Sequence, residues 1–280
     1  MKKISRRSFL AAAGLTVAAL ALTACGGSAS TASSAAASSV AASSEAASTS
    51  AAAAELTTVE AGKLTMATNA TFPPYEMTTD AGTIEGIDVD TAQAIAEKLG
   101  LELQIDDMDF DAALLSVQQG KADIAMAGIT VTDERMAVMS FSDSYATGIQ
   151  SIIVPEGSDI ASPDDLAGKK IGTQRGTTGY IYCSDDFGED SVVAYDSGLT
   201  AVQALNNGQV DAVVIDNAPA TEYVAANPGL KVLDTSYAEE DYAIGMAKGS
   251  ALEDAVNKAL EELKADGTLQ AIVDKYINAN

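Results

Sequence analysis

The sequence predicts an α/β protein whose folded part consists of two lobes. From Lys63 onward, short apolar runs of strand length alternate with segments of helical periodicity, which is typical of mainly parallel sheets covered by helices. This part is about 220 residues long, which is long for one hydrophobic core and comfortable for two. Two β-rich segments, Thr147–Glu156 and Asp241–Ala247, stand where the chain is expected to cross between the lobes.

The elements are predicted in the following order. Seven apolar runs are expected to be strands: Leu64–Ala67, Leu101–Ile105, Asp123–Ala127, Lys170–Thr173, Val192–Ala194, Asp211–Ile215 and Lys231–Leu233. Five helices are expected between them: Asp90–Leu99, Phe110–Gln119, Thr178–Cys183, Leu199–Asn206 and Ala218–Ala226. The segment Ser250–Ile277 is expected to form two more helices, broken at Asp266-Gly267.

Two crossings imply that the first lobe is discontinuous. We expect residues 59–149 and 243–280 to form lobe 1, and residues 150–242 to form lobe 2. Two strands that cross between α/β lobes act as a hinge, and ligands bind in α/β folds beyond the carboxyl ends of the strands. The cleft between the lobes is therefore the predicted binding site.

Residues 1–24 are expected to be an export signal. They hold a basic start and an apolar run, Phe9–Leu22, that is shorter than the roughly 20 residues of a membrane span. The run ends in Leu22-Thr23-Ala24-Cys25, which resembles a bacterial lipobox, so Cys25 is the predicted lipidated N-terminus. Ser5–Leu10 also resembles a twin-arginine signal, and a basic Sec-type signal containing Arg-Arg fits equally well.

Residues 25–58 are almost entirely Ala and Ser and are expected to form a flexible tether. A coil of this length spans about 30 Å root-mean-square. Such a tether suits a folded module that is held near a membrane.

The charge of the chain excludes some partners. It has 40 acidic and 16 basic residues, a net charge of −24, and the signal carries four of the basic residues and none of the acidic ones. An acidic surface repels nucleic acid and anionic lipid headgroups, so we expect no nucleic-acid partner. With Cys25 assigned to the lipid, Cys183 has no disulfide partner and is expected to be a small core residue.

The composition also excludes several kinds of chemistry. The chain has no histidine, which removes His-based acid–base catalysis, Ser-His-Asp triads and His metal sites. Asp107, Asp109 and Asp111 alternate as in a calcium loop, but Ala112 and Gln118 stand at the sixth and twelfth positions, which do not fit an EF-hand. We expect no metal, no cofactor and no catalytic residue.

Arg135 stands out because the chain has only four arginines, two of them in the signal. It follows a run of small residues that ends a predicted strand, and Thr132 is expected to cap a short helix beside it. A guanidinium matches a carboxylate with a planar fork of donors, which a lysine cannot do. Taken alone, a surface arginine paired with Asp133 or Glu134 is the simpler interpretation.

A series of motifs, in order, resembles the polar amino acid-binding proteins of ABC importers, which are extracellular solute-binding proteins of family 3. The motifs are ATNATFPPYEM (67–77), GIDVDTAQAIAEKLG (86–100), MDFDAALLSVQQGKADIAMAGITVTDER (108–135), FSDSY (141–145), LAGKKIGTQRGTTG (166–179) and GQVDAVVIDNAPA (208–220). The resemblance implies the two-lobed periplasmic-binding fold of type II. It also implies an exported, lipid-anchored monomer on the outer face of the cell membrane (the periplasmic side in a Gram-negative cell) that delivers a polar L-amino acid to an ABC permease.

The resemblance also implies which residues hold the two charged groups of an amino acid. Arg135 would bind the carboxylate, aided by the Thr130 hydroxyl and the Gly128 backbone. From lobe 2, Thr177 and Thr178 at a helix start would offer N–H groups and hydroxyls to a negative oxygen. Asp216 would accept the ammonium, although an isolated aspartate at a strand end is most often a helix N-cap.

The resemblance places Phe72 and Phe110 as apolar walls against the ligand side chain. Asn69 and Gln174 depart from the amide-selecting relatives, which often carry an acid and a lysine there, so the pocket is predicted to be polar without a fixed charge. This favours an uncharged polar side chain. A cationic amino acid, with Glu76 or Asp107 as its carboxylate, stays open, and so does cystine. For Arg175 we prefer a surface ion pair to a place at the cleft rim.

Two other functions compete with import. Some dehydratases use the same scaffold, but Cys183 has no evident base, and the glycines of GTQRGTTG (172–179) are spaced wrongly for a nucleotide loop. A ligand-sensing domain for a membrane receptor is the second alternative. A lipid anchor without a membrane span leaves such a domain unable to signal alone.

Overall fold

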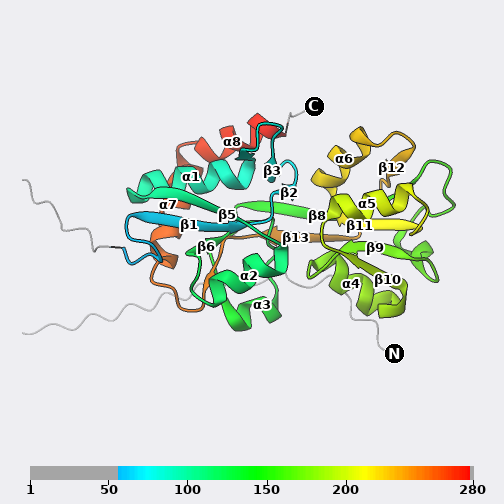
Figure 1. Ribbon diagram of the computed structural model, residues 1–280, viewed down its shortest axis with the longest axis horizontal. Coiled ribbons are helices and arrows are strands. Elements are labelled where there is room, and N and C mark those ends of the chain that lie inside the picture. The colour runs from blue at the N-terminus through cyan, green and yellow to red at the C-terminus, as the bar shows by residue number, and fades with distance from the viewer. Residues whose placement is uncertain (1–55, 278–280) are drawn as a thin grey trace, which may run out of the picture. The chain divides into compact units, whose positions relative to one another are not determined.

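The computed structural model describes residues 56–277, which form two large β-sheets with helices on both faces and a small third sheet (Figure 1). The expected export signal, Cys25 and nearly all of the expected tether lie outside the described residues. Within residues 56–277, no helix has both the length and the apolar character needed to cross a membrane.

The first sheet has the strand order β5-β1-β6-β14-β7. Its strands are β1 (Lys63–Thr68), β5 (Glu102–Asp107), β6 (Ile124–Ala125), β7 (Met139–Phe141) and β14 (Gly245–Ala247). Its helices are α1 (Ile87–Leu99), α2 (Phe110–Gln118), α3 (Asp133–Val138), α7 (Glu253–Ala265) and α8 (Thr268–Tyr276). Successive residues of β1 face opposite sides: Met66 packs in the same cluster as α1 and α7, and Ala67 packs in the cluster of α2.

The second sheet has the order β10-β9-β11-β8-β12, and β13 also pairs with β8. Its strands are β8 (Ala146–Pro155), β9 (Ile171–Gln174), β10 (Val192–Tyr195), β11 (Ala212–Asp216), β12 (Leu230–Val232) and β13 (Ala238–Tyr242). Its helices are α4 (Thr178–Phe187), α5 (Gly198–Asn206) and α6 (Asn217–Ala226), with 3-10 turns η1 (Pro163–Leu166) and η2 (Glu189–Ser191). Cys183 of α4 is fully buried in one of the cores of this sheet, as predicted.

The prediction of mainly parallel sheets is wrong. β1 pairs in parallel with β5 and β6, and β9 with β10 and β11, but β7, β8, β12, β13 and β14 all pair antiparallel. An apolar run indicates a buried strand but does not tell its direction. A small antiparallel sheet of β2 (Thr71–Phe72), β3 (Glu76–Thr78) and β4 (Ile84–Glu85) is absent from the sequence prediction because such short strands carry no periodic pattern.

The chain leaves the first sheet between β7 and β8 and returns between β13 and β14, so the predicted segment Asp241–Ala247 is two strands in two sheets. β8 and β13 pair antiparallel, with Gly148 opposite Glu240 and Ala146 opposite Tyr242. A β-carbon at Gly148 would come within 2.4 Å of the Tyr242 ring, so the two connecting strands are closely packed. The bounds of lobe 1 (residues 59–149 and 243–280) and of lobe 2 (residues 150–242) stay a prediction.

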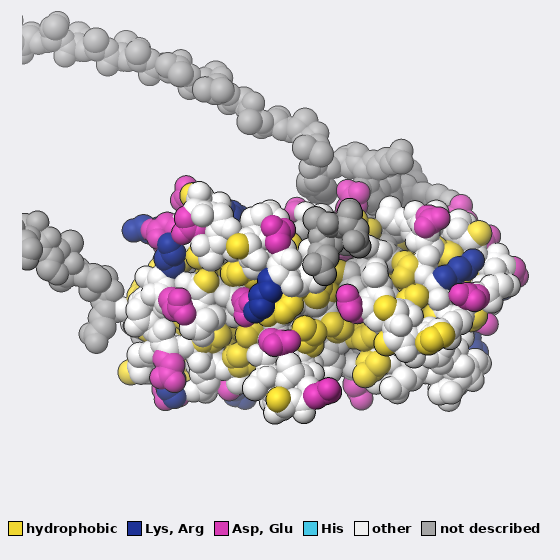
Figure 2. Space-filling view, turned by 90° about the horizontal axis from the view of Figure 1, so that it is seen from above, with side chains coloured by type: hydrophobic (Ala, Val, Ile, Leu, Met, Phe, Trp, Pro, Cys, Tyr) yellow, Lys and Arg dark blue, Asp and Glu magenta, His cyan; other side chains and the backbone are white. Residues whose placement is uncertain are grey.

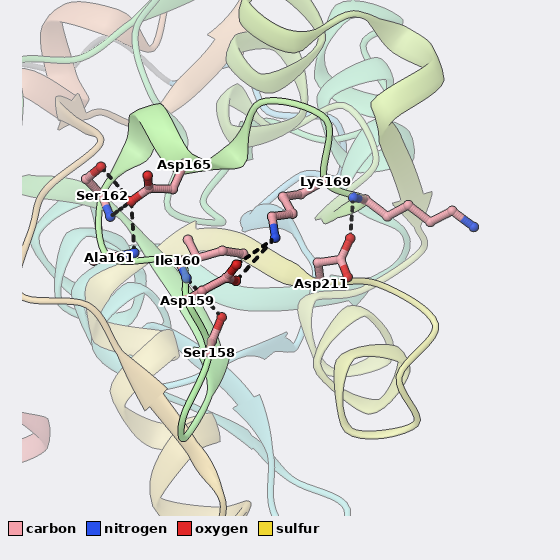
Figure 3. A network of polar contacts seen from close by, with 9 residues as sticks. Ser158, Asp159, Ile160, Ala161, Ser162, Asp165, Lys169 and Asp211 are labelled. Atoms are coloured by element: carbon pink, nitrogen blue, oxygen red, sulfur yellow. Dashed lines mark hydrogen bonds and ion pairs between the residues drawn. The ribbon is translucent and has the colours of Figure 1, made fainter.

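Polar contacts hold the segment that joins β8 to β9 (Figure 3). Ser162 and Asp165 form a capping box at η1, and Lys169 lies 3.2 Å from the Asp159 carboxylate. Asp211 accepts a hydrogen bond of 2.7 Å from the Lys170 N–H. These contacts fix the start of β9, whose opposite end carries Gln174.

The surface is acidic, as the composition predicts. Figure 2 shows Asp and Glu side chains scattered over the visible face of the described residues, with a few Lys and Arg among them.

Candidate ligand-binding site

One cavity is lined by residues of both lobes. It gathers all ten residues that the sequence predicts to bind a ligand: Asn69, Phe72, Phe110, Gly128, Thr130, Arg135, Gln174, Thr177, Thr178 and Asp216. The lining also includes Glu76, Ala127, Gln150, Val214 and Ile215. The ten residues are thus brought together, and their contact with a ligand stays a prediction.

Arg135 is built into the cavity wall by the helix that carries it. Thr132 caps α3 and accepts a hydrogen bond of 3.2 Å from the Arg135 N–H. The guanidinium donates from Nη1 to the Thr130 carbonyl oxygen (2.7 Å) and from Nη2 to the Gly176 carbonyl oxygen (3.1 Å). It also lies over the Phe110 ring, 5.4 Å from its centroid. Three neighbours therefore fix the direction of the guanidinium, and the helix cap fixes the backbone that carries it.

The simpler interpretation of Arg135, a surface ion pair with Asp133 or Glu134, is wrong. The side chain is 8% exposed, and within the described part of the chain it forms no ion pair. Burial lowers the pKa of its guanidinium, and the negative charge of Glu240 acts in the opposite direction. A buried guanidinium bonded to neutral carbonyls is well suited to receive an anion.

Asp216 ends β11 and occupies the N-cap position of α6, but its side chain makes no capping hydrogen bond. Its carboxylate instead accepts hydrogen bonds from Gln150 Nε2 (2.7 Å) and from the Tyr242 hydroxyl. Burial, followed by the charge of Glu240, raises the pKa of Asp216 to about 7. A cation beside this carboxylate would stabilise its ionised form.

The Thr130 hydroxyl and the Gly128 N–H are already engaged with protein groups. Thr130 donates to Glu240 Oε2 (3.1 Å), and so does the Thr178 hydroxyl (3.0 Å). The Gly128 N–H donates to Asp88 Oδ2 (3.0 Å). Because a hydroxyl has one proton, Thr130 can offer a ligand only an acceptor, and Gly128 is left with its carbonyl oxygen. This arrangement differs from the expected carboxylate contacts and suits an ammonium beside Asp216.

Thr177 caps a helix and also belongs to the cavity wall. It is the N-cap of α4, with its hydroxyl accepting from the Tyr180 N–H (3.4 Å) and donating to the Gln174 carbonyl oxygen (2.8 Å). It also lines the cavity. The first N–H groups of a helix lack intrahelical partners, so this turn can receive a negative oxygen.

At another part of the wall, the two predicted amides bind each other. Gln174 Nε2 donates to Asn69 Oδ1 across the lobes (2.9 Å), and Asn69 Nδ2 donates to the Met108 carbonyl oxygen (2.9 Å). Phe72 and Phe110 are 7% and 6% exposed and supply the apolar surface. The amides therefore close the wall between the lobes as well as lining it.

Glu76 is one of the two acids considered as the carboxylate partner of a cationic ligand. It lies in β3, is fully buried and lines the cavity. Apart from the neighbouring carboxyl group of Asp88, with which it can share a proton, neither of its carboxyl oxygens has a hydrogen-bond partner among the described residues. Burial, followed by the charge of Asp88, raises its pKa well above the usual value. Asp107, the other candidate acid, is exposed outside the cavity lining and accepts from the Ala70 N–H (2.8 Å).

Gln150 and Glu240 were missed by sequence reasoning. Both face inward from the connecting strands, where an apolar residue is expected. In β13 the burial alternates, with Glu240 and Tyr242 buried and Glu239 exposed. A polar residue on the buried phase of an alternating strand is the signal that could have identified both.

Arg175 lies outside the cavity lining. It is exposed, lies 3.8 Å from the Asp196 carboxylate, and donates to the Ala194 carbonyl oxygen. The surface interpretation is therefore confirmed. Among residues 56–277 no cluster of His, Cys, Asp and Glu side chains could hold a metal ion.

The chain resembles proteins of known function. Residues 64–279 match the family described as bacterial extracellular solute-binding proteins, family 3. A probable histidine-binding protein of Neisseria gonorrhoeae is 34% identical over 219 residues, which cover 75% of this chain and 81% of that protein. The L-cystine-binding protein TcyJ of Escherichia coli is 32% identical over 226 residues, covering 79% of this chain and 85% of that protein.

A similar solved structure is the arginine-, lysine-, histidine-binding protein ArtJ of Geobacillus stearothermophilus. It has a TM-score of 0.75 and 35% sequence identity, with 78% of this chain and 96% of that chain covered. These relatives are amino acid-binding proteins, and the match confirms the predicted two-lobed solute-binding fold. The relatives are not enzymes, which is consistent with the expectation that this chain has no enzymatic role. With its two sheets, its cavity between the lobes and this match, the chain belongs to family 3 of the bacterial extracellular solute-binding proteins.

Proposed function

We propose that this protein captures a cationic L-amino acid between its lobes. The observation that carries the proposal is Glu76, a buried carboxyl group in the cavity wall whose one hydrogen-bonding neighbour among the described residues is another acid, Asp88. The charged side chains of the lining are Glu76, Arg135 and Asp216. The carboxylate and ammonium of an amino acid balance Arg135 and Asp216, so Glu76 is left for a positively charged side chain.

The uncharged polar ligand predicted from the sequence is the second candidate. The sequence favoured this ligand because the amides of Asn69 and Gln174 were expected to hydrogen-bond its side chain. In the structure these two amides form a hydrogen bond with each other. A protonated Glu76 could still donate a hydrogen bond to an uncharged group, and one relative is named for cystine. The names of two others, for histidine and for arginine, lysine and histidine, support the cationic class.

Thermal unfolding with added amino acids tests the proposal. The purified protein is heated with L-arginine, L-lysine, L-histidine, L-glutamine or L-cystine, each at the same concentration. A ligand at 100 times its Kd stabilises the folded state by about 2.7 kcal/mol. We expect the largest rise in unfolding temperature with L-arginine or L-lysine. A larger rise with L-glutamine or L-cystine would favour the second candidate, and no rise with any of them would refute amino acid binding.

We further propose that the protein is anchored through lipidated Cys25 as a monomer and delivers its ligand to an ABC permease. The Leu22–Cys25 tetrapeptide and the Ala/Ser-rich segment after it support the anchor. Cys25→Ala should move the protein from the membrane fraction to the soluble exported fraction and leave ligand affinity unchanged. An unmodified Met1 on the membrane-bound protein would contradict the anchor. Uptake of labelled L-arginine that requires this protein would separate import from sensing.

A further inference from the structure

Glu240 lies behind the cavity wall on the connecting strand β13. It is 6% exposed, whereas its neighbour Glu239 is exposed on the opposite face of the strand. Its partner across the strands is Gly148 of β8, which has no side chain. A carboxylate at such a position is stable only when hydrogen bonds replace its water.

One of the two oxygens of Glu240, Oε2, receives hydrogen bonds from three directions, while Oε1 is buried without a partner among the described residues. Oε2 accepts from the Thr130 hydroxyl of lobe 1 (3.1 Å), from the Thr178 hydroxyl of lobe 2 (3.0 Å) and from Gln150 Nε2 of β8 (3.0 Å). All three donors line the cavity, and Glu240 does not. The carboxylate therefore acts on a ligand only through the side chains that it holds.

This arrangement fixes what the two hydroxyls can offer. Thr130 and Thr178 each give their single proton to Glu240, so both face the cavity with lone pairs. Gln150 Nε2 donates to Glu240 and also to Asp216. Through Gln150 and Glu240, the two threonine hydroxyls are therefore connected to Asp216, the carboxylate expected to accept the ligand ammonium. The hydroxyl groups that are linked in this way to Asp216 thus present acceptors to the cavity. An ammonium carries three donors and no acceptor, and it matches such acceptors better than any neutral group.

We infer that Glu240 is a positioning residue that makes this subsite select an α-ammonium, by holding the protons of Thr130 and Thr178 away from the ligand. The inference rests on the proposed binding of an amino acid. Glu240, which does not line the cavity, thus controls the selectivity for the α-ammonium of the ligand. Without Glu240, the hydroxyls can turn their protons into the cavity and accept a neutral group in place of the ammonium.

Paired ligands test this role. The dissociation constants of L-arginine and of its 2-hydroxy analogue, L-argininic acid, are measured by titration calorimetry for the wild type, Glu240→Leu and Glu240→Gln. We expect the ratio of the two constants, analogue over amino acid, to fall about tenfold or more in Glu240→Leu, as for the loss of well-placed hydrogen bonds. Glu240→Gln keeps one acceptor oxygen and should show a smaller fall.

Glu239→Gln is the matched control because it removes the same charge from the same strand at an exposed position. Its ratio should equal that of the wild type.

A residue that only stabilises the fold would weaken the binding of both ligands equally, so an unchanged ratio in Glu240→Leu overturns the inference. If thermal unfolding shows that Glu240→Leu does not fold, the ratio of Glu240→Gln decides in the same way. A wild type that binds neither L-arginine nor its analogue would refute the proposed function, and the inference with it, whereas wild-type binding with unchanged ratios refutes the inference alone.

Discussion

Arg135 Nη2 donates to the carbonyl oxygen of Gly176 over 3.1 Å, and this hydrogen bond joins lobe 1 to lobe 2 at the cavity wall. Nη1 of the same guanidinium donates to the Thr130 carbonyl oxygen. Both acceptors are neutral, so the positive charge keeps its attraction for an anion. One side chain thus contributes to the contact between the lobes and to the recognition of a ligand carboxylate.

Arg135→Ala should therefore weaken ligand binding strongly. It removes the cation that faces the ligand carboxylate, and a buried charge left without its partner costs roughly 3–5 kcal/mol, or a few hundred- to several thousand-fold in Kd. Titration calorimetry with L-arginine measures the change. Arg175→Ala is the matched control, because Arg175 is an exposed arginine outside the cavity, and its Kd should equal that of the wild type. Near-native affinity in Arg135→Ala would remove Arg135 from the site.

Ligand affinity should fall as the pH falls below 7. Asp216 has a pKa of about 7, and it must be ionised to accept an ammonium. Below this pH, binding has to displace a proton from Asp216, which weakens the apparent affinity by up to about tenfold per pH unit. Calorimetry at pH 5.5, 7 and 8.5 tests this. Asp216→Asn should bind L-arginine more weakly at pH 8.5 and show a flatter pH profile. An equally steep profile in that variant would assign the titration to another group.

The stability of the protein without added ligand should fall as the pH rises from about 4 to about 7. Burial raises the pKa of Asp216 to about 7 and that of Asp88 to about 6, above the usual value of 3.8. Over this window the folded protein binds more protons than the unfolded chain, so its stabilisation is lost as the pH rises through the folded pKa. Thermal unfolding at several pH values measures the effect. Asp216→Asn should reduce the decline, and a rise in stability over the same window would contradict the prediction.

The sequence predicted the elements that carry a regular apolar pattern. β1 follows from its short apolar run, because it is buried on both faces, and α1, α7 and α8 follow from helical periodicity, because one face of each packs into the core. The antiparallel direction of β8 and β13 was not accessible, since pairing partners lie far apart in the chain and an apolar run has no direction. All ten site residues line the cavity because the ordered motifs place them at strand ends and helix starts.

What the sequence could not give is the hydrogen-bond partner of each polar side chain. From the sequence, the amides of Asn69 and Gln174 are expected to be available to a ligand. Only the fold shows that they form a hydrogen bond with each other. Glu240 looks like one acid in the run Glu239-Glu240-Asp241 until the pairing of β13 with β8 turns it inward. Such differences arise from contacts between residues that lie 92 and 105 positions apart in the chain, and no local pattern predicts them.

Glu76 decides the charge of the ligand side chain in our proposal, so Glu76→Gln should change selectivity and leave the head-group contacts intact. The substitution keeps the shape of the side chain and removes its capacity to become anionic. We expect calorimetry to show about tenfold or greater loss of affinity for L-arginine, as for a lost charge-assisted hydrogen bond, and little loss for L-glutamine. Asp107→Asn is the control, because Asp107 is an acid outside the cavity lining. An equal loss for both amino acids would show that Glu76 supports the fold and does not read the ligand's charge.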